Sequence, residues 1–285
     1  SPLAPKMKRQ AQDLNNLGMA QESRQQWDTA IQFYRRALGS LGNDPMVWNN
    51  LGIAQAFSGQ IKEAVQSFEK ALKLASDSKA ISRNLALLHL AQASALNRSG
   101  KFASQNEVVL HLKEALRLQP DCAEARFGLI QFLEKQNQWN DVRTHYEILV
   151  KDRPDSVAAW NGLGYASYRT DKPQLAVEAL EQSLRLDPKQ AAIWHLCGVH
   201  QARFQRWHEA IVSLEHCVQL KPDNVEAWHQ MGLVHAQLQH WNDAIAAQQK
   251  ALRLQPRWPP AQKALAAALF DHGRLDQARG LYEEL

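Results

Sequence analysis

Apolar and polar side chains alternate with a helical period along almost the whole chain. Within residues 45–78 the apolar positions form two amphipathic stretches, which consist of Leu51, Ala54, Ala64, Val65, Phe68, Ala71 and Leu72. Ser58 and Gly59, which are typical turn residues, separate the two stretches. The pattern therefore predicts two helices joined by a tight turn.

The same pattern recurs with a period of 34 residues. Three sets of residues show this spacing, namely Trp160, Trp194 and Trp228; Ala176, Ala210 and Ala244; and Pro188, Pro222 and Pro256. Because the period is fixed at three separate points, the chain is a tandem array of repeats. The frame gives an N-terminal extension, 1–10, and eight repeats at 11–44, 45–78, 79–122, 123–156, 157–190, 191–224, 225–258 and a truncated 259–285.

Particular residue types recur at fixed places within the repeat, counted from 1 to 34. Trp stands at place 4, Leu-Gly at 7 and 8, Ala at 20, an aromatic at 24, Ala at 27 and Pro at 32, most fully in the second repeat. This pattern resembles the tetratricopeptide repeat (TPR) family over everything after about residue 10. The resemblance implies an all-α fold, a right-handed α-solenoid of about eight TPR helix-turn-helix hairpins.

The residue types at these places have physical reasons. Small residues at Gly52 and Ala64 let paired helices approach closely, and Ala71 admits the next repeat. A proline such as Pro222 ends the second helix. A single hairpin cannot bury its apolar face alone, so successive repeats are expected to stack. Eight of the nine tryptophans fall at place 4 or 17, where we expect them to pack between helices, and Trp258 is the exception.

The third repeat is ten residues longer than the others, and the extra residues lie between His89 and Val108. They are predicted to lengthen both helices by more than a turn and to make a projecting hairpin. Leu96 and Phe102 near its tip suggest a second contact surface, and a tolerated insertion is the alternative. Because the chain stops inside the expected second helix of repeat eight, we expect either an excised portion of a longer protein or an end that packs on something else.

Composition and charge exclude several partners. A net charge of +4 without a concentrated basic stripe argues against a nucleic-acid binder. No apolar run approaches the roughly 18 to 20 residues that a membrane helix needs, so direct membrane insertion is not expected. Three cysteines without a CxxC pair indicate reduced thiols and favour the cytoplasm. The chain start lacks a signal peptide, and a periplasmic location stays open if a signal was removed.

Motifs for catalysis are incomplete. His208-Glu209 begins like a zinc-protease HExxH motif but lacks the second histidine, and Gly162-Leu163-Gly164 lies within a helical stretch. We therefore expect neither enzymatic activity nor a cofactor. His195 and His229 occupy one place in successive repeats, about 10 Å apart by helix-packing distances, which is too far for a shared metal. No metal site is expected.

The resemblance implies that first helices line a concave groove, with places 2, 5, 6, 9, 12 and 13 facing it. The residues predicted to bind a partner there are Asn16, Asn49, Asn50, Arg83, Asn84, Phe127, Asn161, Tyr165, Tyr168, Arg169, His195, Arg203 and His229. An asparagine ladder suits the backbone of an extended peptide, because each amide both donates and accepts, and TPR proteins are known for such binding. Aromatic rings beside arginines are typical of interface hot spots. A solvated wall without a ligand is the alternative.

The ligand is expected to carry apolar anchors. Place 9 reads Met19, Ile53, Leu87, Gln131, Tyr165, Val199, Leu233 and Ala267, so the groove floor is largely apolar. No three successive repeats carry the Lys and Asn set with which the chaperone adaptors of this family hold an acidic C-terminal tail. The sequence thus predicts an interaction scaffold that binds a peptide segment or partner protein. Two alternatives stay open: a substrate-recognition arm of a glycosyltransferase or sulfotransferase type of enzyme, and an assembly factor for a bacterial pilus, secretion or polysaccharide-export system. Self-association is also left open.

Overall fold

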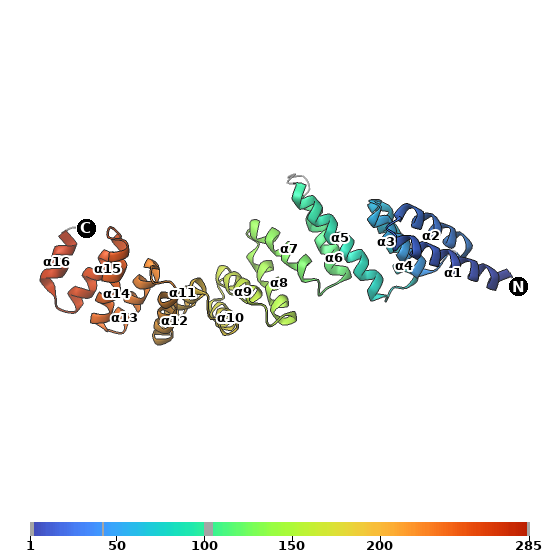
Figure 1. Ribbon diagram of the computed structural model, residues 1–285. Helices are drawn as coiled ribbons and strands as arrows, with labels where there is room; N and C mark the ends of the chain where they lie inside the picture. The colour runs from blue at the N-terminus through green and yellow to red at the C-terminus, as the bar shows by residue number, and fades with distance from the viewer. Residues whose placement is uncertain (1–2, 42, 100–104, 284–285) are drawn as a thin grey trace. The chain divides into compact units, whose positions relative to one another are not determined.

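The computed structural model describes residues 3–41, 43–99 and 105–283, and this part of the chain consists of helices and turns without a strand (Figure 1). The helices are α1 (Leu3–Glu22), α2 (Trp27–Leu41), α3 (Pro45–Phe57), α4 (Ile61–Leu74), α5 (Lys79–Ser99), α6 (Gln105–Leu118), α7 (Ala123–Lys135), α8 (Trp139–Asp152), α9 (Val157–Arg169), α10 (Pro173–Leu186), α11 (Ala191–Arg203), α12 (Trp207–Leu220), α13 (Val225–Gln237), α14 (Trp241–Leu254), α15 (Pro259–Asp271) and α16 (Leu275–Glu283). From α3 on, every odd-numbered helix begins at place 1 of a predicted repeat. The predicted all-α solenoid of hairpins is confirmed.

The chain divides into two compact units, which we call the N-terminal unit (Ser1–Gln136) and the C-terminal unit (Asn137–Leu285). Within the N-terminal unit, helices from α1 to α7 pack in chain order, each on the next. The same holds from α8 to α16 in the C-terminal unit. Consecutive packing of this kind is the arrangement that a tandem array of hairpins requires.

Small residues sit where the paired helices come closest. The alanines at place 20 have no exposed surface, namely Ala30, Ala64, Ala176, Ala210 and Ala244. A Cβ added to Gly52 would lie 2.9 Å from the ring of Phe68, and one added to Gly198 would lie 2.8 Å from Leu214. Place 8 therefore accepts glycine because the side chain at place 24 of the same hairpin fills the space.

A left-handed residue at place 15 makes each described hairpin turn. The residues with positive φ are Gln25, Gly59, Asn137, Asp171, Gln205, Gln239 and Gly273. In repeat seven, the next backbone N–H, that of His240, bonds to the carbonyl of His235 over 2.9 Å and closes the turn. This is the C-terminal capping geometry in which the chain leaves a helix through one left-handed residue.

Three of the tryptophans at place 4 bind the preceding repeat. The indole Nε1 of Trp160 donates to the carbonyl of Pro154, and Trp194 and Trp228 make the same bond to the preceding prolines, over 2.8 to 2.9 Å. Each bond joins place 4 of one repeat to place 32 of the repeat before it. The expected packing role of these tryptophans thus includes a specific hydrogen bond.

The long third repeat has a longer first helix, as predicted. This helix, α5, has 21 residues, eight more than α3 with 13. The second helix, α6, is described from Gln105, directly after residues 100–104, which lie outside the described part of the chain, so its predicted lengthening stays a prediction. Leu96 is half-buried on α5, whereas Phe102 lies outside the described residues. The predicted N-terminal extension, 1–10, is helical from Leu3 and forms the first part of α1.

Candidate functional site

In each unit, first helices of some successive repeats contact one another. These contacts join α1 to α3 and α3 to α5 in the N-terminal unit, and α11 to α13 and α13 to α15 in the C-terminal unit. The side chains that these helices turn away from their hairpin partners form a shared surface, which we call the inner face. The predicted binding residues all stand on first helices, and some of them lie on this face.

An asparagine ladder runs across the inner face of the N-terminal unit. Asn50 on α3 donates to Oδ1 of Asn15 on α1 over 3.2 Å, and Asn84 on α5 donates to Oδ1 of Asn49 over 2.9 Å. Asn49 in turn donates to Asn50 over 3.4 Å. The ladder therefore joins neighbouring repeats, because place 6 of one repeat reaches place 5 of the repeat before it. Each amide still has further donor and acceptor capacity, since one carries two N–H groups and two lone pairs.

Three other predicted residues of this unit lie apart from the ladder. Asn16 is exposed and accepts a bond of 3.5 Å from Gln12, and Arg83 is exposed on α5. Phe127 on α7 is half-buried and lines a cavity of about 270 Å³ together with side chains of α5 and α6. The structure thus brings the asparagines together but places Phe127 at a different surface, beside the long third hairpin.

The C-terminal unit carries a group of stacked arginine and aromatic side chains. The guanidinium carbon of Arg169 lies 4.2 Å from the ring centre of Trp139, and Nη1 donates to the hydroxyl of Tyr165 over 3.2 Å. The rings of Trp139 and Tyr165 meet edge to face, 5.4 Å apart. A cation over an aromatic face is attracted by the ring quadrupole and is held in place by it. Arg169 is therefore oriented while it stays exposed.

A second stack adjoins the first through α9. Arg203 on α11 lies 5.3 Å from the ring centre of Tyr168, which in turn packs on the ring of His200 at 4.5 Å. We refer to both stacks together as the cation–aromatic cluster, which comprises Trp139, Tyr165, Tyr168, Arg169, His200 and Arg203. It unites four residues predicted from sequence with Trp139 and His200, which were not predicted to bind.

An apolar row, which shares Tyr165 with this cluster, occupies place 9 of three successive first helices. Tyr165 on α9 is 44% exposed and Leu233 on α13 is 38% exposed, with the half-buried Val199 of α11 at the same place between them in sequence. In the N-terminal unit the place 9 residues Met19 and Leu87 are 51% and 50% exposed. Several of the large apolar side chains at place 9, which were predicted to form the groove floor, are thus exposed to solvent.

Asn161 and His195, both at place 5, are half-buried side chains of first helices. Asn161 donates to Oε1 of Gln190 over 2.7 Å. His195 is half-buried, and its Nε2 has no hydrogen-bond partner among the described residues. Burial lowers the pKa of His195, although the carboxylate of Glu226 opposes this shift. His195 is therefore a neutral imidazole at physiological pH.

His229 is at the same place in repeat seven and is almost fully buried. Its Nδ1 lies 2.9 Å from Oε1 of Gln248, whose Nε2 donates to the backbone carbonyl of His229. The ring of Trp258 packs edge-on against His229 at 4.9 Å. These contacts hold His229 in place and leave little of its ring accessible to a ligand. They also show what Trp258, which the repeat pattern did not explain, packs against.

A relation between neighbouring repeats could have identified Trp139. It stands at place 17, and its partner Arg169 stands at place 13 of the next repeat. Trp27 and Phe57 hold the same two places and stack with ring centres 4.6 Å apart. Pairing place 17 with the following place 13 would therefore have predicted the first stack, whereas we found no sequence signal for His200.

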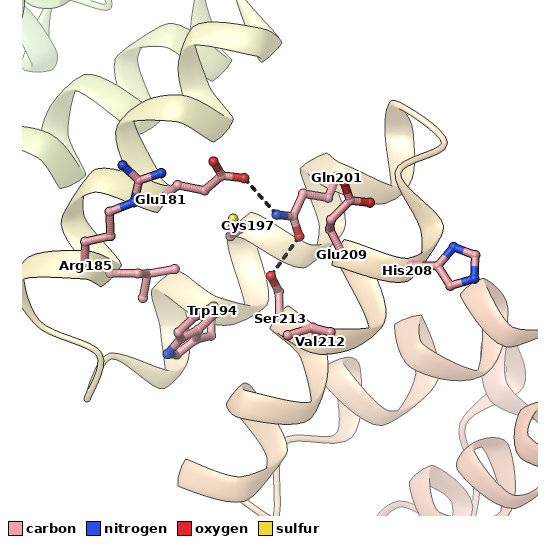
Figure 2. Close-up of a pocket in the computed structure, with 10 residues that line it drawn as sticks. Glu181, Arg185, Trp194, Cys197, Gln201, His208, Glu209, Val212 and Ser213 are labelled. Atoms are coloured by element: carbon pink, nitrogen blue, oxygen red, sulfur yellow. Dashed lines mark hydrogen bonds between the residues drawn. The ribbon is translucent and has the colours of Figure 1, made fainter.

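A separate depression of about 450 Å³ lies between α10, α11 and α12, away from the apolar row (Figure 2). Figure 2 shows Gln201 bridging two neighbours: it donates to Glu181 over 3.0 Å and accepts from Ser213 over 2.7 Å. Cys197 on its floor has no exposed surface, and burial raises the pKa of this thiol to about 12. A thiol that stays protonated is a small core side chain rather than a nucleophile.

Comparison with known proteins agrees with this architecture. Family models described as tetratricopeptide repeat match residues 14–45, 45–78, 133–191 and 225–258. No curated protein gives a significant match. No helix among the described residues has the length and apolar character needed to cross a bilayer.

Solved structures share the fold at low sequence identity. The structure of YrrB, described as a TPR protein with an unusual peptide-binding site, is 19% identical over 69% of this chain and 96% of its own, with a TM-score of 0.53. A crystal structure of MamA is 21% identical over 53% of this chain and 88% of its own, with a TM-score of 0.52. Naa15/Naa10 bound to HypK-THB matches 96% of this chain and 41% of its own at 16% identity and a TM-score of 0.57. These likenesses show the fold alone. Together with the matching repeats and their register in the structure, the family models show that the chain belongs to the tetratricopeptide repeat family.

Proposed function

We propose that the protein is an interaction scaffold that binds a peptide segment or partner protein with apolar anchors on the inner face of its C-terminal unit. The observation that carries the proposal is the apolar row at place 9. Tyr165 and Leu233 are exposed large apolar side chains on first helices two repeats apart, with Val199 at the same place of the repeat between. Exposed apolar groups that recur at one place suit a ligand that runs along several repeats.

The cation–aromatic cluster supplies directional contacts beside this row. Arg169 and Arg203 both stand at place 13 and are both exposed, and neither makes an ion pair with another described residue. Each guanidinium rests on an aromatic ring, so little side-chain freedom remains to be lost when a ligand binds. Tyrosine and arginine with this arrangement are typical of residues that contribute strongly to binding.

The asparagine ladder gives the N-terminal unit a complementary property. Amides that already bond to one another are fixed in orientation, and their remaining N–H groups and lone pairs suit the backbone of an extended chain. The likeness to YrrB, which is described as having a peptide-binding site, is consistent with a peptide ligand for this chain.

The test is selection of 12-residue peptides from a random display library on the intact chain, followed by fluorescence polarisation with the tightest peptide. We expect that peptide to carry at least two large apolar residues. Tyr165→Ala combined with Leu233→Ala should weaken its binding by at least about tenfold, because two anchors that become buried in the complex are removed.

The matched control removes two equally exposed apolar side chains from second helices. Leu186 and Leu254 end α10 and α14 and are 44% and 38% exposed, as Tyr165 and Leu233 are. Leu186→Ala combined with Leu254→Ala should leave peptide binding unchanged. Equal losses in both double variants, or a loss only in the control, would contradict binding on the inner face.

A further inference from the structure

The turn between α13 and α14 brings three potential metal ligands together. Among the residues that the structure describes, the ligand atoms of His235, His240 and Asp243 all lie within 4.8 Å of one another. The ring centres of the two histidines are 6.0 Å apart. His235 is half-buried in the last turn of α13, whereas His240 and Asp243 are exposed at the start of α14. Two imidazoles and one carboxylate are a ligand set that Zn²⁺ takes in proteins.

The backbone fixes where these side chains start. Gln239 adopts a left-handed φ of 60°, and the N–H of His240 bonds to the carbonyl of His235 over 2.9 Å. The turn is the one that closes the other described hairpins, so it forms from the repeat pattern without help from a ligand. The three side chains are therefore held on one short, closed segment.

Repeats two and six show which contact His235 replaces. Place 11 carries Gln55 in repeat two and Gln201 in repeat six, and each accepts a hydrogen bond from a serine twelve residues later, over 2.6 and 2.7 Å. In repeat seven the glutamine is replaced by His235 and the serine by Ala247. The internal hydrogen bond is thereby lost.

The loss leaves a buried polar atom without a partner. Nδ1 of His235 is inaccessible to solvent and has no hydrogen-bond partner among the described residues. A buried unpaired nitrogen lowers stability unless something binds it. A metal ion coordinated by this nitrogen would supply the missing partner. Two histidines exposed at the surface would need no such partner, because water would bind their nitrogens.

Charged groups of both signs lie around His235. Burial is the main cause that lowers the pKa of His235, with Asp243 and Glu215 opposing the shift and His240 adding to it. Glu215 on α12 and Asp243 line the same depression of about 490 Å³ as His235, and the basic side chains of Lys250 and Arg253 line it too. The short distances among the three ligand groups and the unpaired nitrogen, rather than the local charge, therefore point to a metal.

We propose that His235, His240 and Asp243 form a binding site for a divalent transition metal of the Zn²⁺ type. Tetrahedral coordination with bonds of about 2.0 to 2.1 Å places ligand atoms roughly 3.3 Å apart. The exposed side chains of His240 and Asp243 rotate freely enough to close the remaining distance to His235. The spacing argument against a shared metal applied to histidines of successive repeats, whereas all three ligands here lie in one hairpin.

The ligand count leaves one coordination position open. Structural zinc sites have four protein ligands, whereas three protein ligands leave room for water or for a side chain of another molecule. The metal at this site therefore both fastens α13 to α14 and offers a point of attachment at the hairpin turn.

The test is titration of the intact, tag-free protein with Zn²⁺ by isothermal calorimetry, together with its thermal unfolding midpoint with and without Zn²⁺. His235→Gln combined with Ala247→Ser restores the Gln–Ser pair of repeats two and six, so this variant should fold. We expect it to lose one bound equivalent of Zn²⁺ and the metal-induced rise of the midpoint. His240→Ala should weaken the same binding event at least about tenfold, because loss of a residue that only supports a ligand already costs about 10- to 100-fold.

His208→Gln serves as the control, since it removes an exposed histidine from the neighbouring hairpin. It should bind Zn²⁺ with the stoichiometry and affinity of the unaltered protein. Unchanged Zn²⁺ binding in the His235→Gln/Ala247→Ser variant would overturn the proposal, because the metal would then be bound elsewhere. Absence of binding to the unaltered protein at micromolar Zn²⁺ would overturn it as well.

Discussion

His200 is a buried polar side chain that packs as an aromatic ring. It is 1% exposed, and neither ring nitrogen has a hydrogen-bond partner among the described residues. Its ring lies against Tyr168, and the guanidinium of Arg203 lies over the ring of Tyr168. Burial, helped by the charge of Arg203, lowers the pKa of His200 to about 4. The imidazole is therefore neutral in the folded protein, and it packs against Tyr168 of the cation–aromatic cluster.

Acidification should destabilise the C-terminal unit through this residue. The unfolded chain protonates His200 near pH 6.5 and the folded chain only near pH 4, so the unfolded state binds the proton first. Stability from this group is complete above about pH 6.5 and decreases as the pH falls towards 4, by at most about 3 kcal/mol. The measurement is the urea unfolding of the intact chain between pH 7 and pH 4.

His200→Leu separates this effect from that of other histidines. Leu88 holds the same place in repeat three and is buried there, so the substitution suits the site. The variant should lose less stability on acidification than the unaltered protein does. Parallel pH dependences of the two proteins would show that His200 does not contribute.

Residue-level patterns predicted the small residues between paired helices but not the hydrogen bonds among polar side chains. The glycines at place 8 and alanines at place 20 were predictable because close approach of two helices admits no larger side chain. The bond from Asn84 to Asn49 and the pairing of His229 with Gln248 were not, because an amide or imidazole has the same appearance in sequence whether it faces a ligand or a neighbour. The partners lie 35 and 19 residues away, and three-dimensional coordinates were needed to find them.

At the scale of elements, a bond between a tryptophan and a proline carbonyl joins each of repeats five, six and seven to the repeat before it. Trp160, Trp194 and Trp228 each donate to the carbonyl six residues earlier, so the linker between hairpins is fastened to the next first helix. The proline ends the second helix, which leaves its carbonyl free to accept. Places 32 and 4 are therefore physically coupled.

Replacing Trp194 by phenylalanine should remove this bond while keeping most of the apolar contact. We expect the free energy of unfolding of the C-terminal unit to fall by about 1 kcal/mol, the usual net contribution of one hydrogen bond. Trp160→Phe and Trp228→Phe should give similar losses, since the bond is the same in all three. Urea denaturation followed by helical circular dichroism measures these losses, and unchanged midpoints in all three variants would show that the bond adds nothing.

In the third hairpin, the repeat pattern does not determine where the helices begin and end. Ten extra residues in repeat three can lengthen one helix, both helices or the loop without changing the period on either side. The structure extends α5 to 21 residues, whereas α6 has 14 residues within the described part of the chain. Amphipathic periodicity continues through Ala93 on α5, which is buried, and this continuity was a signal that the first helix would be the longer one.

At the scale of the whole molecule, a tandem array restricts how far a local change spreads. Each hairpin contacts mainly the hairpins before and after it, so the free energy of the array is close to a sum of repeat and nearest-neighbour contributions. The chain also divides into two compact units after Gln136. A defect in one unit should therefore leave the hydrogen bonds of the other unit protected.

Gly52→Val tests this directly, because the new side chain would collide with the ring of Phe68 and cost about 1 to 3 kcal/mol. In hydrogen exchange followed by mass spectrometry, amides of α3 and α4 should exchange faster, and those of α2 and α5 should follow to a smaller degree. Amides of α11 to α14 should keep their rates. Gly198→Val, placed against Leu214 in the C-terminal unit, should give the opposite distribution. Faster exchange over the whole chain in either variant would mean that both units unfold together, since only strong coupling between them could carry the defect so far.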